Sequence, residues 1–189
     1  MAQSSKQTNW YVITGGPNSG KTCVINYFAY IGYLIRPEIA RMIIDDEISK
    51  GKKLEQIRVN EVKFLKEITK LKIQAEDSTL PEQVVFWDRG IPDDIAYLNY
   101  YKADATFQIE AVQKRRYKEI FLLEMLPNYK RDYARIESEE SAYNIQEEIY
   151  KTYTELGYKV TRVPVISIEE RVNHILEKIQ KSSFWIARK

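Results

Sequence analysis

Glycine, lysine and threonine recur near the amino terminus at a spacing that suits phosphate chemistry. Gly15 is followed after four residues by Gly20, Lys21 and Thr22, and the apolar run 11–14 leads directly into this segment. Backbone N–H groups of such a loop can curl around phosphate oxygens, while the helix that follows points its positive end at the same anion. The lysine then reaches the outer phosphates, and the threonine hydroxyl can ligate Mg²⁺. The pattern predicts a binding loop for ATP or GTP, formed by Gly15, Gly16, Pro17, Asn18, Ser19, Gly20, Lys21, Thr22 and Cys23.

An aspartate follows another apolar run further along the chain. Asp88 comes directly after residues 84–87 and precedes Arg89 and Gly90. In proteins with such a phosphate loop, an acid at the end of a strand commonly holds the magnesium ion of the nucleotide. The alternative is that Asp88 takes the proton of an attacking hydroxyl group, because one carboxylate does not do both jobs in the same step. A strand that ends in aspartate at a turn also occurs without any metal.

Further charged side chains are candidates for holding the molecule that accepts phosphate. Glu38 and Arg41 lie three residues apart, on one face of a helix that Pro37 is expected to begin. Either they contact this acceptor or they pair with each other at the surface. Arg89 is expected to bind a phosphate or to pair with Glu38 or Asp93, and Asp93 has the alternative role of a helix cap. The predicted acceptor site consists of Glu38, Arg41, Arg89, Asp93 and Tyr97.

A basic segment follows the fourth apolar run and is a candidate lid over the reacting groups. Arg131 and Arg135 lie four residues apart within residues 126–138. Their guanidinium groups could close over the transferring phosphoryl group, where positive charge stabilises the transition state. The alternative is a solvated helix start in which Asp132 pairs with Arg135.

Short apolar runs alternate with helical patterns along the whole chain. Strands are predicted at 11–14, 33–35, 84–87, 119–123 and 159–163. Helices are predicted at 21–30, over about 54–75 as one long helix, at 142–156 before Gly157, and from a capping box at Ser167 and Glu170, with Ile168 on the buried face of the last one. Such alternation implies an α/β fold, with a parallel sheet covered by helices on both faces.

Composition excludes several classes of protein. The 189 residues include 29 Lys or Arg and 27 Asp or Glu, so the net charge is only +2 and no general nucleic-acid binder is expected. Cys23 and His174 are the only residues of their kinds, which excludes an intrachain disulfide and a multi-histidine metal cluster. We expect a small buried role for Cys23; the alternative is a thiol activated by the helix start. The polar first ten residues and the lack of a long apolar stretch predict one cytoplasmic domain over residues 1–189.

The motifs together resemble an AAA-domain family of predicted nucleotide or nucleoside kinases. The resemblance rests on 14–22, 37–41, 86–93, Asp132 with Arg135, and 153–171. The family is similar to the kinase domains that phosphorylate ribosylnicotinamide in bacterial NAD regulators. It implies the nucleoside-monophosphate-kinase-like P-loop NTPase fold, in three layers, with five parallel strands in the order 2-3-1-4-5. It also implies that Arg135 is the lid arginine and that Asp88 is the magnesium or base carboxylate.

The sequence therefore predicts a Mg²⁺-dependent phosphotransferase with Lys21, Asp88, Arg131 and Arg135 as catalytic residues and with Thr22 and Asp88 as metal ligands. It would move the γ-phosphoryl group of ATP or GTP to a small nucleoside-like or nucleotide-like acceptor. The alternative is a regulatory nucleotide-binding protein with slow hydrolysis and a protein or lipid partner. The predicted tail 182–189 places apolar residues between cations and suits such a contact, although packing against the sheet is favoured. The sequence does not set the oligomeric state.

Overall fold

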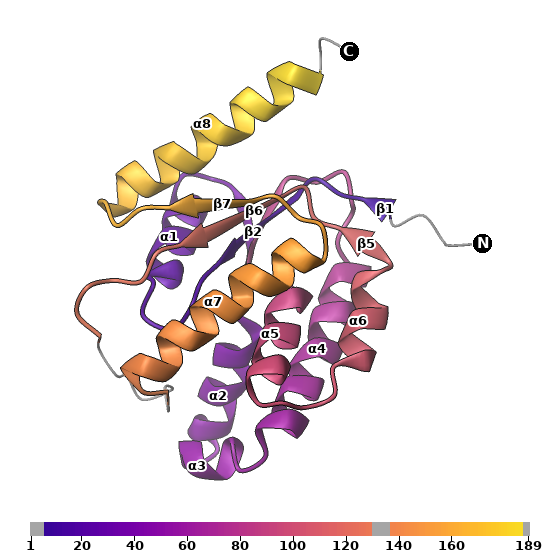
Figure 1. Ribbon diagram of the computed structural model, residues 1–189, viewed down its shortest axis with the longest axis vertical. Helices are drawn as coiled ribbons and strands as arrows, with labels where there is room; N and C mark the ends of the chain where they lie inside the picture. Colours follow the sequence, from indigo (N-terminus) through magenta and orange to yellow (C-terminus); the bar gives the residue numbers. More distant parts are fainter. Residues whose placement is uncertain (1–5, 130–136, 187–189) are drawn as a thin grey trace.

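A computed structural model of the chain describes residues 6–129 and 137–186, and for 182–186 it describes the backbone only. Its centre is a five-stranded parallel sheet with helices on both faces (Figure 1). The strands are β2 (Trp10–Thr14), β3 (Leu34–Arg36), β4 (Val85–Asp88), β6 (Glu119–Leu123) and β7 (Val160–Val163). They lie in the order β3-β4-β2-β6-β7, which is 2-3-1-4-5 when only these strands are counted. The predicted fold class and strand order are confirmed.

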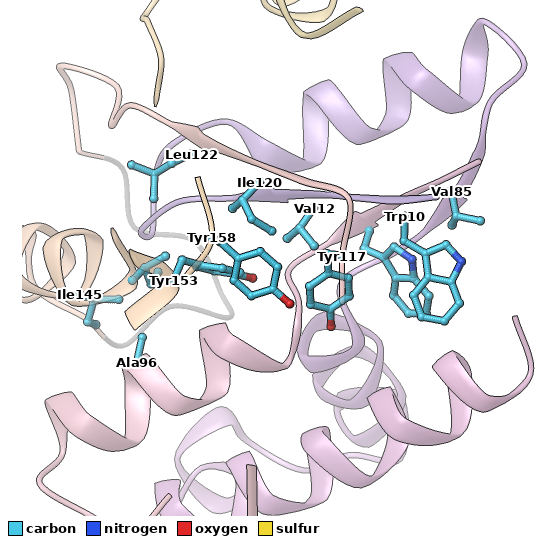
Figure 2. Close-up of a cluster of buried hydrophobic side chains, with 12 residues drawn as sticks. Trp10, Val12, Val85, Ala96, Tyr117, Ile120, Leu122, Ile145, Tyr153 and Tyr158 are labelled. Atoms are coloured by element: carbon cyan, nitrogen blue, oxygen red, sulfur yellow. The ribbon is translucent and has the colours of Figure 1, made fainter. Parts of the chain in front are cut away.

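Alternating side chains of the central strand β2 belong to the two core clusters that lie on opposite faces of the sheet. Trp10 and Val12 pack on the face that is covered by α4 (Glu61–Asp77), α5 (Ile91–Tyr100) and α7 (Glu139–Glu155) (Figure 2). Tyr11 and Ile13 pack on the other face, against α1 (Lys21–Tyr30) and α8 (Ile168–Ile186). Every residue of β2 is buried, because both faces of a parallel sheet are covered, and this explains the continuous apolar run.

The remaining elements lie outside these layers. They are helices α2 (Ile39–Ser49), α3 (Leu54–Ile57) and α6 (Thr106–Val112), and the short strands β1 (Lys6–Gln7) and β5 (Arg115–Arg116). Strands β1 and β5 pair in parallel as a second, two-stranded sheet that the sequence did not predict. Each of these strands consists of only two polar residues, which is too short for an alternation of apolar and polar residues to be recognised in the sequence.

The prediction of one continuous helix over residues 54–75 is wrong. Two helices, α3 and α4, are separated by residues 58–60. The side chain of Asn60 accepts a hydrogen bond from the backbone N–H of Lys63 and caps α4. Arg58, in the break, pairs with the distant Glu137 at 3.0 Å. A local cap and a long-range ion pair therefore interrupt an apolar pattern that continues through the break.

The last two helices begin and end largely as predicted. Ser138 caps α7 by accepting from the N–H of Ser141, and Gly157 follows this helix with a φ of 76°. The capping box of Ser167 and Glu170 is present at the start of α8. Ile168 is nevertheless 43% exposed, against the prediction, because the first turn of α8 follows an exposed loop and burial begins one turn later.

The final helix also continues into the predicted tail, since α8 extends to Ile186. Within the described ranges, no helix combines the length and the apolar character needed to cross a membrane.

A buried acid in the layer of α4 makes stability depend on pH. Glu76 is 3% exposed, accepts a hydrogen bond from the hydroxyl of Tyr117, and lies 3.8 Å from the guanidinium of Arg115. Burial raises the pKa of Glu76 to about 7 from an ordinary 4.5, against the opposing effects of Tyr117 and Arg115. The folded protein therefore holds this proton more tightly than the unfolded chain does. Its contribution to stability is complete below about pH 4.5 and is lost as the pH rises through 7.

We expect urea denaturation to show a steeper loss of stability in the wild-type protein than in Glu76→Gln. Between pH 5 and pH 8 the free energy of unfolding should fall by about 1–3 kcal/mol more in the wild type, because glutamine carries no charge to bury. Glu67→Gln, at an exposed position of the same helix, is the matched control. Equal pH dependence in the wild type and in Glu76→Gln would contradict this assignment.

Candidate nucleotide and acceptor site

The loop between β2 and α1 has backbone conformations that suit its glycines. Gly15 has a φ of 139° and Gly20 a φ of 81°, both in the region that favours glycine. A Cβ atom on Gly15 would lie 2.6 Å from the carbonyl oxygen of Leu123, so the loop passes too close to β6 for any side chain here. Asn18 also has a positive φ, of 64°, and its side-chain amide donates to the carbonyl of Asn128 at 2.9 Å. The backbone conformation of the loop is therefore restricted by its glycines, by the neighbouring strand β6 and by the hydrogen bond of Asn18.

The ammonium group of Lys21 lies folded back across this loop. It donates to the carbonyls of Gly15 and Gly16, each at 2.9 Å, and to the hydroxyl of Ser19 at 3.2 Å. Lys21 is 7% exposed, and burial lowers its pKa to about 7, with a further contribution from the nearby cation of Arg89. An anion in the loop would favour the charged form of Lys21 and compete with these carbonyls for it.

Thr22 and Cys23, on the first turn of α1, are both exposed and line a cavity in front of the loop. The prediction that Cys23 is buried is therefore wrong. Val24 and Ile25, the next residues, turn towards the sheet and join the core instead. Which side chains of α1 face the sheet depends on the rotation of the helix about its axis, and the preceding loop sets this rotation.

Asp88 ends β4 beside the strand that leads into the loop, in register with Ile13. It is 4% exposed, and its Oδ1 atom has no hydrogen-bond partner among the described residues. Burial raises the pKa of Asp88 to about 7, and the negative charge of Glu38 adds to this effect. A buried carboxylate oxygen without a partner, beside a phosphate loop, fits the needs of a hard cation.

The described residues include no group of three or more His, Cys, Asp or Glu that could hold a metal ion by themselves. Mg²⁺ is usually bound by one or two protein oxygens that act together with phosphates and water. Asp88 and the hydroxyl of Thr22 fit that role.

Arg89 lies at the centre of an ionic cluster beside Asp88. Its φ of 68° is unusual for a residue with a side chain, and its backbone N–H donates to the carbonyl of Ile13 at 3.1 Å. The guanidinium donates to Glu38 at 2.9 Å, to Asp93 at 3.0 Å and to the hydroxyl of Tyr97 at 3.3 Å. Both ion pairs that were considered for Arg89 are therefore present. Burial opposes the charge of Glu38, but Arg89 and Lys21 lower the pKa of Glu38 to about 2.

Asp93 is completely buried and acts as an acceptor for several donors. Besides Arg89, the backbone N–H of Gly90 donates to it at 2.9 Å, the hydroxyl of Tyr153 at 2.7 Å, and the hydroxyl of Thr14 also donates to it. The capping role of Asp93 at α5 is thus confirmed. Its two oxygens are committed to orienting Arg89 and to joining β2, α5 and α7.

A cavity of about 270 Å³ joins the loop to the predicted acceptor residues. The cavity is lined by Lys21, Thr22 and Cys23, by the predicted acceptor residues and by a wall of apolar side chains. These further lining residues are Glu38, Arg41, Arg89, Asp93 and Tyr97, with Ala40, Ile44, Phe64, Leu65 and Ile68 in the wall. The structure therefore brings together the two sets that the sequence predicted. Arg131 and Arg135, like most of the predicted lid, lie outside the described residues.

Several residues of the site were not anticipated. Arg58 and Glu137 line the cavity as an ion pair, although Arg58 was assigned to the interior of a helix. Gln146 of α7 accepts from the N–H of Gly16 and donates to the carbonyl of Leu123 at 3.2 Å. These residues are far from the loop in sequence and carry no local pattern, so only the tertiary packing shows them.

Comparison with known proteins identifies the family. Residues 10–171 match a protein family described as an AAA domain. The chain belongs to this AAA-domain family. None of the curated proteins gives a significant match to it.

Several solved structures, two of them kinases, share the fold of this AAA-domain protein. The crystal structure of NadR protein in complex with NR aligns with a TM-score of 0.69 at 16% identity, over 94% of this chain and 50% of that one. Deoxyadenosine kinase from M. mycoides aligns at 0.63 and 14% identity, over 91% and 99% of the two chains. Thymidylate kinase from Ehrlichia chaffeensis aligns at 0.61 and 14% identity, over 90% and 97%. The AAA-domain protein thus spans about half of the NadR chain and nearly all of the two kinase chains.

Proposed function

We propose that this protein is a Mg²⁺-dependent phosphotransferase that moves the γ-phosphoryl group of ATP or GTP to a hydroxyl group of a small nucleoside-like molecule. The observation that carries the proposal is the single cavity that joins the Lys21 loop to the cluster of Glu38 and Arg89. A donor in the loop and an acceptor against the cluster would meet within it. The shared fold of nucleoside and nucleotide kinases supports this reading.

The chain's own residues divide the work of the transfer. The loop amides and Lys21 would hold the β- and γ-phosphates, and Lys21 would neutralise charge that develops on them. Thr22 and Asp88 would hold Mg²⁺, which supplies charge neutralisation at the phosphate oxygens. The acceptor oxygen forms the new bond to the γ-phosphorus while the bond from this phosphorus to the β–γ bridging oxygen breaks, and the nucleoside diphosphate leaves with that oxygen. The proton of the acceptor hydroxyl is released to solvent. The buried Oδ1 atom of Asp88, which has no hydrogen-bond partner among the described residues, favours the metal role, and Glu38, on the cavity wall, would orient the attacking hydroxyl.

The charges of the acceptor side favour an uncharged acceptor over a phosphorylated one. Arg58 pairs with Glu137 at 3.0 Å, and Lys72 pairs with Asp94 at 2.6 Å, as Arg89 does with Glu38. A phosphate group binds best to cations that are not already committed to carboxylates. An ionised glutamate on the same wall would also repel it. The apolar wall suits the base or sugar of a nucleoside.

The test is a panel of nucleosides, nucleoside monophosphates and phosphosugars, each offered with Mg-ATP or Mg-GTP while release of the diphosphate is followed. At least one nucleoside should raise turnover about tenfold or more over water, and its monophosphate should not. Asp88→Asn should lower this rate by about 100-fold, as expected for the loss of a metal-bound charge in the transition state. Asp46→Asn, at an exposed position of α2, serves as the control. Turnover that no acceptor accelerates would favour a regulatory nucleotide-binding protein instead.

A further inference from the structure

Arg171, in α8, lies against the back of the phosphate loop and outside the cavity. It is 2% exposed, and its Nη1 atom donates to the carbonyl oxygen of Ser19 at 2.7 Å. The same atom would lie 3.2 Å from a Cβ atom placed on Gly20. The guanidinium is therefore packed directly against the peptide group that joins these two loop residues.

The charge of Arg171 has no carboxylate partner in the part of the chain that the structure describes. Its Nε and Nη2 atoms are buried without a hydrogen-bond partner, and no ion pair involves this side chain among those residues. Glu124 acts on Arg171 only at longer range and pairs instead with Arg162, at 3.0 Å. Burial lowers the pKa of Arg171, but a guanidinium group remains charged in proteins. By contrast, Arg58 and Arg89 of the same site each contact two carboxylates.

Burial of a charge without a counter-charge costs free energy, and an anion bound in the neighbouring loop would reduce this cost. A polyphosphate in the loop would supply the missing negative charge on the other side of the Ser19–Gly20 peptide. In a trans peptide the C=O and the N–H point in opposite directions. Donation by Arg171 to the carbonyl of Ser19 therefore polarises the unit whose other end is the N–H of Gly20, and makes that N–H a stronger donor to an anion.

We propose that Arg171 is a positioning residue of the nucleotide site, whose charge is balanced only when a triphosphate occupies the loop. The inference rests on the proposed function in one respect, that the loop binds a nucleoside triphosphate. Helix α8 would then take part in binding the nucleotide through Arg171. Nucleotide binding would in turn strengthen the contact between α8 and the loop.

The test compares Arg171→Met, Arg171→Gln and Arg171→Lys in a buffer without phosphate or sulfate. Thermal unfolding measures the nucleotide-free protein, and calorimetric titration measures the Kd for Mg-ATP and for adenosine. Methionine removes the charge and the hydrogen bond, glutamine keeps a hydrogen-bond donor only, and lysine keeps both a donor and the charge. Lys178→Met, at an exposed position further along α8, controls for loss of a positive charge on this helix.

Arg171→Met and Arg171→Gln should weaken Mg-ATP binding about tenfold or more, while Arg171→Lys stays within about threefold of the wild type and adenosine binding is unchanged. The Tm of nucleotide-free Arg171→Met should equal or exceed that of the wild type, because an uncompensated charge has been removed. A purely structural role would give the opposite result, with a lower Tm and unchanged affinity for Mg-ATP in the folded variants. If Arg171→Met does not fold, equal Mg-ATP affinities of the glutamine and lysine variants would overturn the proposal. A wild-type protein that binds neither Mg-ATP nor Mg-GTP would instead refute the proposed function, and this inference with it.

Discussion

Replacement of Lys21 by alanine is expected to weaken the binding of Mg-ATP or Mg-GTP by about 100-fold or more, with the fold retained. A single buried ammonium that contacts the outer phosphates contributes a charge-assisted hydrogen bond, and 100-fold corresponds to about 2.7 kcal/mol. In the structure this ammonium is held by the carbonyls of Gly15 and Gly16, so its removal leaves no carboxylate unpaired. The Tm without nucleotide should therefore change little.

Calorimetric titration with Mg-nucleotide, beside thermal unfolding of the same samples, measures both quantities. Lys70→Ala, at an exposed position of α4 where the lysine pairs only with Glu67 among the described residues, is the control for loss of one lysine. If Lys21→Ala binds nucleotide within about threefold of the wild type, the loop is not the nucleotide site. In that case neither a kinase nor a regulatory nucleotide-binding protein would be supported.

Replacement of Asp93 by alanine is expected to be the most destabilising single change in the site. The substitution leaves Arg89 without one of its two carboxylates and removes the acceptor for Gly90, Tyr153 and Thr14, all in a fully buried position. Breaking a buried, hydrogen-bonded charge pair by removing one partner typically costs about 3–5 kcal/mol. Urea denaturation, with the linear dependence of the free energy of unfolding on denaturant, measures the loss.

Tyr153→Phe provides the matched comparison, because it removes a single hydrogen bond to Asp93 and keeps the aromatic packing. We expect a loss of only about 1 kcal/mol for this variant. Similar losses for Asp93→Ala and Tyr153→Phe would show that the carboxylate does not organise the cluster. A loss confined to Asp93→Ala would instead show that the carboxylate organises the cluster through partners other than Tyr153.

The sequence by itself determined the phosphate loop and the alternation of strands and helices, and the strand order came from the resemblance to the AAA-domain family. The spacing of Gly15, Gly20 and Lys21 specifies a local backbone path, which nearby residues impose without help from the rest of the chain. The strands were readable because a sheet that is covered on both faces demands continuous apolar runs. Glu38 and Arg89 lie within three residues of the ends of two such runs, and their pairing was one of the alternatives that the sequence offered for Arg89.

Only the tertiary structure decided which side chains of the site contact one another and how burial shifts their pKa values. Arg171 reaches Ser19 across a separation of 152 residues, and Arg58 reaches Glu137 across 79. No local pattern marks such pairs, since each depends on how a distant helix packs. The exposure of Cys23 and the break before Asn60 likewise depend on helix phase and on long-range contacts that apolar spacing does not encode. Burial then sets the electrostatics: it raises the pKa of Asp88 and leaves Arg171 without a counter-charge in the described chain, because desolvation exists only once the protein has folded.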